Sequence, residues 1–473
     1  MRSQKPAQRF IVASQAAVAD SSLRGKIENA TGRHLEQLAL TRAAFAPFEA
    51  ERDAARQIKH DAISRLDELL FELRTRLEKN GCKVFFAATA AQARQYVAGV
   101  ARAAGVKRVV KGKSMTAEEV GLNAALEGVG AQVFETDLGE FIVQLRGEHP
   151  SHILTPAIHL SRQDVGALFH EKLGVPQSDD PQVLTAAARD HLRNVFLSAD
   201  MGITGVNFAV AETGTLVVVE NEGNGRLAHT MPPIYVALMG IEKVIPKLGD
   251  LSHFLEVLAR TATGQKLTAY TSFISGPRRQ DEADGPQEMH VVILDNGRGA
   301  MLADPVLREA LYCIRCGACL NVCPVYRQIG GHAYASAYPG PIGAVVSPAI
   351  FGPPAAHLPF ASTLCGACRE VCPVRIDIPR LLLHLRWNAT QAPEAREWPR
   401  PWRRVTRGIA RFSRLARHPR LARLTGRILR TLCRPFARNG YLRRMPPPFS
   451  GWTRFRDFPT PGGRPHQPGS GPK

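Results

Sequence analysis

The stretch CIRCGACLNVCP at residues 313–324 decides the fold of the second half of this chain, and CGACREVCP at residues 365–373 repeats part of it. Together they hold seven of the nine cysteines, at the spacings C-x2-C-x2-C-x3-C-P and C-x2-C-x3-C-P. Three thiolates on one tight loop can reach three irons of a cubane cluster, and in two-cluster ferredoxins the fourth cysteine of a run binds the other cluster. The spacing therefore predicts a module that binds iron–sulfur clusters and carries electrons.

Two clusters are expected, with ligands exchanged between the two runs. The ligands expected for the first, a [4Fe-4S] cluster, are Cys313, Cys316, Cys319 and Cys372. Those expected for the second are Cys323, Cys365 and Cys368. This second set lacks one cysteine, because Ser362 stands three residues before Cys365, where the first run has Cys313. The second site is therefore expected to hold a [3Fe-4S] cluster, a [4Fe-4S] cluster completed by Ser362 or an external ligand, or a cluster with an open iron.

Zinc sites and disulfides are the other uses of closely spaced cysteines. A zinc ribbon also contains C-x2-C pairs, but zinc takes four ligands per ion and has no need of the C-x2-C-x2-C-x3-C-P form. Disulfides are disfavoured by this spacing and by the lack of a convincing secretory signal. Cys82 opens an apolar segment, where a free cysteine behaves as a small hydrophobic residue. Iron–sulfur binding is therefore the preferred interpretation.

Length and charge divide the chain into four segments. With 473 residues, it is too long for one ordinary core. From His384 onward it carries 20 arginines and 1 lysine against 3 acidic residues, so this end holds +18 of the total charge of +19. The expected segments are an N-terminal helical arm at residues 1–54, an α/β domain at 55–292, the cluster module at 293–385 and an arginine-rich region at 386–473.

The arginine-rich region is predicted to be a basic amphipathic segment followed by a disordered end. Arginines alternate with Ile409, Phe412 and Leu415, and apolar residues return at helical spacing after Pro419. Such a segment suits an anionic membrane surface or an acidic partner, and the alternative is a solvated pair of helices. Nucleic acid is not expected, because no recognition module accompanies the charge. The residues from Pro446 onward, rich in proline and glycine, are predicted to be disordered.

The sequence contains no stretch of 18 or more apolar residues, so no transmembrane span is expected. Polar residues interrupt the apolar segment that begins at Phe10, which makes it a poor signal peptide. The expected location is the cytoplasm, with peripheral contact at the inner face of the membrane.

Residues 55–292 alternate between helical and extended patterns. Apolar residues recur at helical spacing between Asp61 and Lys79, and the pattern stops at Asn80-Gly81. The elements expected next are a strand at 83–88, a helix at 90–104, a strand at 107–110, a helix opened by the capping box Thr116-x-x-Glu119, a strand at 132–135 and a short helix near Phe141. This alternation predicts an α/β fold with a mostly parallel sheet, covered on both faces, and with functional loops beyond the carboxyl ends of its strands.

Two loops of this domain are candidate sites. Residues 111–116, KGKSMT, join a strand to a helix, so their lysines and amides can receive a phosphate or carboxylate. An ordinary capped helix with exposed lysines has the same pattern, and the P-loop frame is absent. Glu212, in the segment AETGT at 211–215, precedes an apolar strand and is a candidate catalytic acid, base or nucleophile. The alternative for Glu212 is a glutamate that caps a turn.

Several of these motifs resemble the lactate-utilization protein B family. The resemblance covers residues from about 60 to 390 and rests on GITG at 202–205, AETGT at 211–215, CIRCGAC at 313–319, PGPIG at 339–343, LCGAC at 364–368 and VCPV at 371–374. It implies a LUD domain at 55–292, whose fold resembles the NagB/RpiA/CoA-transferase superfamily. It also implies that an α-helical, ferredoxin-like dicluster domain with the same seven cysteines follows, and then a basic C-terminal region.

The resemblance implies a role in oxidising L-lactate to pyruvate, within a system that includes a cysteine-rich subunit resembling heterodisulfide reductase and a second LUD protein. This chain would be the electron carrier, and its basic region would hold the assembly near a membrane acceptor. In one alternative, the α/β domain is itself the lactate-oxidising or acyl-handling enzyme and uses Glu212 and residues 111–116. In another, the chain is a redox-responsive adaptor.

Overall fold

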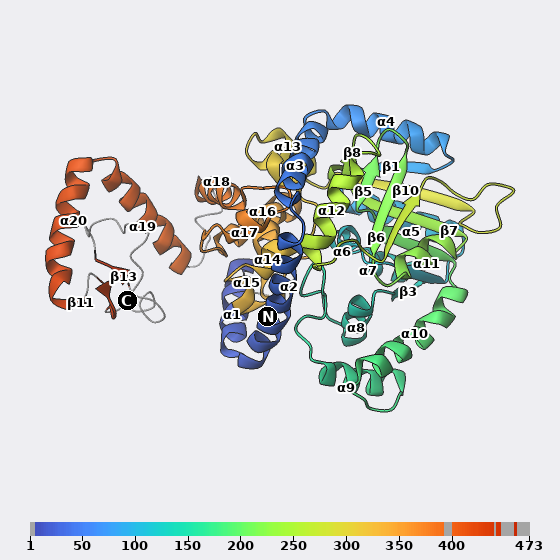
Figure 1. Cartoon of the computed structure of the whole chain (residues 1–473), viewed down its shortest axis with the longest axis horizontal. Coiled ribbons are helices and arrows are strands. Elements are labelled where there is room, and N and C mark those ends of the chain that lie inside the picture. The colour runs from blue at the N-terminus through green and yellow to red at the C-terminus, as the bar shows by residue number, and fades with distance from the viewer. Residues whose placement is uncertain (1–4, 392–399, 439–440, 446–457, 461–473) are drawn as a thin grey trace. The chain divides into compact units, whose positions relative to one another are not determined.

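The computed structural model describes residues 5–391, 400–438, 441–445 and 458–460 (Figure 1). The chain divides at residue 392 into two compact units. The first unit contains both the predicted α/β domain and the predicted cluster module, so these two parts share one body.

A six-stranded, wholly parallel sheet is the centre of the α/β part, in the order β1-β10-β7-β4-β2-β3. Its strands are β1 (Lys83–Ala87), β2 (Arg108–Lys111), β3 (Gln132–Glu135), β4 (Met201–Gly205), β7 (Ile234–Gly240) and β10 (Glu288–Leu294). β7 and β10 are almost continuous runs of buried apolar residues, as parallel strands covered on both faces must be. The predicted parallel sheet is therefore confirmed, and the first three predicted strands are β1, β2 and β3.

Alternate residues of the central strands pack against different layers. Val236 and Leu238 lie in an apolar cluster with the helices of one face, α5 (Ala90–Ala103), α6 (Met115–Val120) and α7 (Leu122–Glu127). Tyr235 and Ala237 belong to the larger cluster of the other face. A third cluster beside β2 is formed by α8 (Leu138–Arg146), α9 (Arg162–Leu173), α10 (Pro181–Leu197) and α11 (Asn224–Thr230). The sheet is therefore buried on both faces.

A second sheet of four strands packs on the same face as Tyr235, and the sequence pattern did not predict it. Its order is β8-β5-β6-β9, with β6 antiparallel to both of its neighbours and β5 parallel to β8. The strands are β5 (Phe208–Val210), β6 (Thr215–Glu220), β8 (Val244–Ile245) and β9 (Tyr270–Ile274). Only β6, which contains the predicted strand at 216–219, is longer than five residues, so alternation is too short to be visible in the others.

Two predictions for helix boundaries are wrong. The helical pattern from Asp61 to Lys79 belongs to two helices, α3 (Phe48–Ser64) and α4 (Leu66–Lys79), separated by Arg65. The helix after β2 is capped by Ser114 and not by Thr116, because the Ser114 hydroxyl accepts the amide hydrogen of Ala117 at 3.1 Å. The predicted capping-box glutamate, Glu119, has its carboxylate on Arg298 instead.

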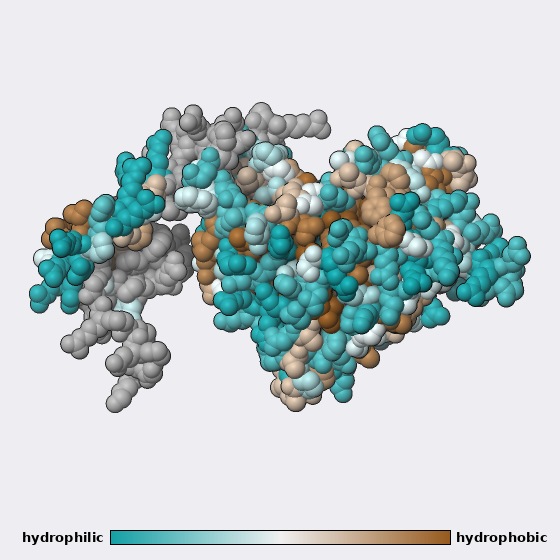
Figure 2. All heavy atoms as spheres, turned by 90° about the horizontal axis from the view of Figure 1, so that it is seen from above, coloured by the Kyte–Doolittle hydropathy of each residue, from teal (hydrophilic) through white to brown (hydrophobic). Residues whose placement is uncertain are grey.

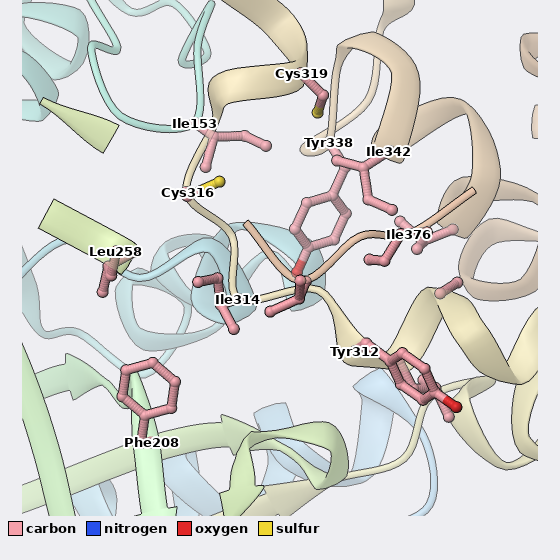
Figure 3. Packing of buried hydrophobic residues seen from close by; sticks show 14 of the residues in the cluster. Ile153, Phe208, Leu258, Tyr312, Ile314, Cys316, Cys319, Tyr338, Ile342 and Ile376 are labelled. Carbon is pink, nitrogen blue, oxygen red and sulfur yellow. The ribbon is translucent and has the colours of Figure 1, made fainter. Parts of the chain in front are cut away.

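The cluster module consists of short helices and is covered by the N-terminal helices. α1 (Pro6–Ala19) and α2 (Ser21–Ala43) both pack against α15 (Tyr326–Ile329), and α3 packs against η2 (Leu307–Tyr312). The other helices of the module are α13 (Arg298–Ala303), α14 (Ala318–Asn321), α16 (Gly340–Phe351), α17 (Ala367–Val371) and α18 (Ile378–Gln391), with single turns η3 (His332–Tyr334), η4 (Pro353–Ala355) and η5 (Leu358–Phe360). The α/β part also contains α12 (Leu251–Ala262) and the single turn η1 (Ile241–Lys243). Figure 3 shows Cys316, Cys319 and Tyr338 in the same apolar cluster as Phe208 and Leu258, so one core serves both parts.

The second unit contains two basic helices, α19 (Arg400–Ala416) and α20 (Pro419–Cys433), followed by η7 (Arg434–Phe436). Three two-residue strands, β11 (Ala437–Arg438), β12 (Tyr441–Leu442) and β13 (Phe458–Pro459), form a small antiparallel sheet. Large apolar side chains are exposed here, Phe412, Leu421, Leu424, Ile428 and Leu432 among them, and Figure 2 shows apolar patches within its hydrophilic surface. The predicted disordered end lies largely outside the described residues. Within the described part of the chain, no helix is long and apolar enough to cross a membrane.

Candidate iron–sulfur site

The two cysteine runs have the same backbone conformation. The residue before Cys316 in the first run and the residue before Cys365 in the second are both left-handed, with φ of 62° at Arg315 and 57° at Leu364. The glycine after each of these cysteines is also left-handed, with φ of 73° at Gly317 and 90° at Gly366. Each glycine caps a short helix, α14 in the first run and α17 in the second. The loops are therefore repeats of one unit, with glycine where a side chain would be strained.

Ser362 has the same local geometry as Cys313. The amide of Arg315 donates a hydrogen bond to the Sγ of Cys313 at 3.4 Å. At the matching position, the amide of Leu364 donates to the Oγ of Ser362 at 3.1 Å. The second loop therefore places a hydroxyl oxygen where the first loop places a thiol.

The structure brings Cys372 to the thiols of the first run. Burial raises the pKa of Cys316, and the neighbouring thiols of Cys372 and Cys313 raise it further. Burial raises the pKa of Cys372 to about 11, again with Cys313 among its neighbours. Burial followed by the thiols of Cys316 and Cys313 raises the pKa of Cys319. These four thiols form one group although Cys372 belongs to the second run.

The remaining thiols form a second group. Burial raises the pKa of Cys368 to about 12, and the thiols of Cys323 and Cys365 act in the same direction. Cys365 is exposed, whereas Cys323 and Cys368 are buried. The two groups adjoin each other, because Cys368 is also one of the neighbours of Cys319 and α14 packs against α17. The assignment of the two groups as cluster ligands stays a prediction.

The donor set fits iron–sulfur clusters better than zinc. Four thiolates around one zinc ion at about 2.3 Å lie within about 4 Å of each other. Among the described residues, the one group of three or more metal-binding side chains within 4.8 Å is Glu148, His159 and His332, and it includes no cysteine. The thiols are therefore more widely spaced, as ligands of different irons must be. Backbone amides also reach the sulfurs, from Tyr326 to Cys323 at 3.5 Å and from Ile376 to Cys372 at 3.4 Å.

A buried ionic network ties the first cysteine loop to the α/β part. Arg298 donates to Glu119 and Glu242, at 2.7 and 2.6 Å. The second oxygen of Glu242 is 3.3 Å from the guanidinium of Arg315, which is next to Cys316. Although burial acts to raise the pKa of Glu242, the arginines lower it to about 2. The hydroxyl of Tyr338 donates to Glu119 at 2.7 Å and completes the link.

A cavity of about 280 Å³ lies at the carboxyl ends of β2 and β4, against the first cysteine loop. Residues 112–116 line it, together with Lys243, Arg315 and Tyr338. Lys111 is not available to a ligand, because it is buried between Glu135 at 2.8 Å and Glu118 at 3.1 Å. Residues 112–116 of the candidate loop therefore face the cavity, whereas Lys111 forms internal ion pairs.

Glu212 lies outside this cavity. Its side chain is exposed in the turn between β5 and β6 and accepts the amide hydrogen of Leu248 at 3.0 Å. The structure therefore does not bring Glu212 together with residues 112–116, and the geometry is that of a turn-capping glutamate.

Sequence reasoning missed the basic residues next to the thiols. Arg52, in α3, donates to the carbonyl oxygens of Cys372 and Glu370, both at 2.7 Å from its Nη2. Lys243 is buried in the single turn η1 and carries no motif that would have identified it. Arg315 stands within the first cysteine run, so its position beside the ligands was the one available signal.

The fold and the paired cysteine loops define a class of protein, a LUD domain joined to a 4Fe-4S dicluster domain. The LUD domain family matches residues 70–294, and the 4Fe-4S dicluster domain family matches residues 309–376. The chain is 43% identical over 456 residues to lactate utilization protein B of Macrococcus caseolyticus, a match that covers 96% of this chain and 94% of that protein. The chain belongs to the lactate utilization protein B family.

Other relatives agree with this membership. Lactate utilization protein B of Oceanobacillus iheyensis is 42% identical over 441 residues, which are 93% of this chain and 91% of that protein. An uncharacterized electron transport protein of Escherichia coli is 45% identical over 340 residues, which are 72% of this chain and 71% of that protein. A solved structure of a DUF162 family protein from Deinococcus radiodurans matches 48% of this chain and 98% of its own, with a TM-score of 0.27 and 16% identity.

Proposed function

We propose that this protein is the iron–sulfur electron-transfer subunit of a system that oxidises L-lactate to pyruvate. The observation that carries the proposal is the gathering of seven thiols into two adjoining groups, in a family whose members are named for lactate utilization. Iron–sulfur clusters bound there supply one-electron transfer. The thiols Cys316, Cys319 and Cys372 are buried and Cys365 is exposed, so the second site is the one nearer to a redox partner.

The proposed ligands are those predicted from the cysteine spacing. The first site is a [4Fe-4S] cluster on Cys313, Cys316, Cys319 and Cys372. The second is a [4Fe-4S] or [3Fe-4S] cluster on Cys323, Cys365 and Cys368. Supporting the difference between the sites, the second loop offers only the hydroxyl of Ser362 at the position of Cys313.

The proposed partners are a cysteine-rich subunit resembling heterodisulfide reductase and a second LUD protein. The exposed apolar and basic side chains of α19 and α20 support peripheral contact with a membrane or an acidic acceptor, because such helices bind anionic surfaces by charge and by apolar burial. A chain ending at residue 391 tests this part, since it removes the second unit. Loss of sedimentation with anionic vesicles is the expected result, and unchanged sedimentation would contradict it.

Anaerobic reconstitution with the proposed partners tests the function itself. L-Lactate should reduce the clusters of this chain, as seen by bleaching of their visible absorbance, at a rate that matches pyruvate formation. Clusters that stay oxidised while pyruvate forms would exclude an electron-transfer role. If the chain is instead a redox-responsive adaptor, its clusters should likewise stay oxidised while pyruvate forms.

A further inference from the structure

The cavity beside the first cysteine loop has no cysteine among its lining residues, so cluster binding does not account for it. It lies between the carboxyl ends of parallel strands and the cluster module, which is where ligands bind in open α/β sheets. Gly112 and Gly205 let neighbouring backbone segments of the cavity wall approach closely. A Cβ on Gly205 would come within 3.1 Å of the Ser114 hydroxyl. A volume of about 280 Å³ suits a molecule of few atoms.

Lys243 gives the cavity an unpaired cation. The residue is buried, with 8% of its surface exposed, and it lines the cavity. Its ammonium has no hydrogen bond and no ion pair within 4.0 Å to another residue of the described chain. Burial lowers its pKa to about 8, although the charge of nearby Glu242 acts to raise it. A buried ammonium of this kind is stabilised when an anion binds.

Arg315 supplies a second cation at the same end. Its guanidinium lies 4.5 Å from the ring centre of Tyr338, and its Nη2 is 3.3 Å from Glu242. Its Nη1 is buried without a hydrogen-bond partner among the described residues. Glu242 is already bonded to Arg298, and together Glu242 and Glu119 face the three cationic side chains Arg298, Arg315 and Lys243, which leaves one positive charge in excess.

The acidic residues of the cavity are committed elsewhere. Asp137, Glu220 and Glu222 accept backbone amides of Gly139, Gly225 and Leu138, at 3.1, 2.7 and 3.0 Å. Lys113, the third lysine near the site, donates to the carbonyl oxygen of Leu154 at 2.7 Å. The charges of Asp137, Glu220 and Lys113 affect the pKa of Glu222. The charges of Glu242, Arg315 and Cys313 affect the pKa of Lys243. The cavity therefore has one cationic end, and it is the end beside the first cysteine loop.

We propose that this cavity binds a small 2-hydroxy or 2-oxo monocarboxylate, with the carboxylate on Lys243 and Arg315. The class of acid rests on the proposed function, whereas the demand for a small anion rests on the geometry alone. An anion here adds negative charge close to Cys313. It should therefore oppose electron uptake at the first site and lower the reduction potential of one cluster.

The test is anaerobic titration of the cluster-loaded protein with L-lactate, pyruvate and inorganic phosphate, followed by calorimetry and by redox potentiometry. We expect one site per chain for lactate or pyruvate, at least tenfold weaker binding of phosphate, and a lower potential for one cluster when the acid is bound. Absence of binding by either acid, or a preference for phosphate, would overturn the proposal.

Lys243→Met removes the ammonium and keeps an apolar stem of similar length. Loss of a charge-assisted hydrogen bond should weaken binding roughly tenfold to a hundredfold. The variant should unfold at an equal or higher denaturant concentration, because an unpaired buried charge is removed. Lys247→Met is the matched control, since Lys247 is exposed and outside the cavity. Unchanged affinity in Lys243→Met, with clusters intact, would contradict the proposal.

The two proposals fail in different ways. If the wild type binds neither acid but its clusters are reduced by lactate in the presence of the partners, only the cavity assignment is wrong. If the acid binds but the clusters are never reduced, the electron-transfer function is wrong and the site remains.

Discussion

The side chain of Arg52 donates two hydrogen bonds to the backbone carbonyl oxygen of Cys372. The Nε and Nη2 of this buried arginine donate to the carbonyl oxygen of Cys372, at 3.1 and 2.7 Å. The contact spans 320 residues of chain and connects the N-terminal helices to a proposed ligand of the first cluster. The N-terminal arm is therefore part of the cluster module, although the sequence showed it only as a separate helical segment.

Arg52→Met should destabilise the first site. The substitution removes both side-chain donors from the carbonyl oxygen of Cys372, which keeps the amide hydrogen of Arg375 at 3.1 Å, and it removes the donor to the carbonyl oxygen of Glu370. Loss of these charged hydrogen bonds costs about 1–3 kcal/mol. We expect faster loss of one cluster when the protein is incubated with an iron chelator, measured by visible absorbance. Arg74→Met is the control, because Arg74 pairs with Glu78 on an exposed helix face. Equal rates in the two variants would contradict a supporting role for Arg52.

The crossed ligand sets predict which variants share a defect. Cys372→Ala should remove the same electron paramagnetic resonance signal as Cys313→Ala, because both thiols belong to the first group. Cys323→Ala should remove the signal that is lost in Cys365→Ala. If Cys372→Ala behaves like Cys365→Ala, each run holds its own cluster and the exchange is wrong.

Ser362→Cys should complete the second site. The Oγ of Ser362 already accepts the amide that the Sγ of Cys313 accepts in the first loop, so a thiol introduced there needs no change of backbone. We expect two [4Fe-4S] clusters by iron analysis and no oxidised [3Fe-4S] resonance signal. Ser362→Ala, which offers no ligand, is the comparison. A [3Fe-4S] signal that persists in Ser362→Cys would show that the fourth position does not reach the cluster.

Glu242→Gln should be strongly destabilising. It leaves Arg298 and Arg315 with one uncompensated buried charge, and breaking a buried pair in this way costs about 3–5 kcal/mol. The free energy of unfolding of the cluster-loaded protein in urea measures it. Glu288→Gln removes an exposed carboxylate that pairs with Lys83, and its cost should stay below about 1 kcal/mol. Similar costs for both would mean that the network does not hold the cysteine loop.

Glu212→Gln should leave lactate-dependent cluster reduction unchanged. The side chain is exposed and accepts one backbone amide, so a small effect on stability, within about 0.5 kcal/mol, is expected. Reduction of the clusters in the reconstituted system is the measurement. A large loss of rate with intact clusters would revive the hypothesis that the α/β domain is the enzyme through Glu212.

The sequence was a good guide where a local pattern determines the structure. Alternating strands and helices predicted the parallel sheet, because β1, β2 and β3 are short extended segments separated by helices, of which α5 is amphipathic. The cysteine spacing predicted two equivalent loops, and Ser362 was identified as the position that differs. Both kinds of feature depend on residues that are close together in the chain.

Features that depend on distant residues were not predictable in this way. The second sheet pairs strands too short to show alternation, and Val244 joins it from beyond β7. Arg52 and Lys243 come from segments far from the cysteine runs, and only the folded chain shows that Arg52 contacts Cys372 and that Lys243 lies near Cys313. The capping box was misplaced because Ser114 and Thr116 are both suitable caps, and the choice depends on where β2 ends.

The packing of α1 and α2 against α15 has a consequence for biosynthesis. These helices leave the ribosome before α15, which packs against both of them and is made some 300 positions later. The nascent chain must therefore carry them uncovered through most of translation, when an apolar helix face is prone to aggregation. Assembly of the proposed first cluster also has to wait for Cys372, so its insertion and the closure of the N-terminal helices both come late in synthesis.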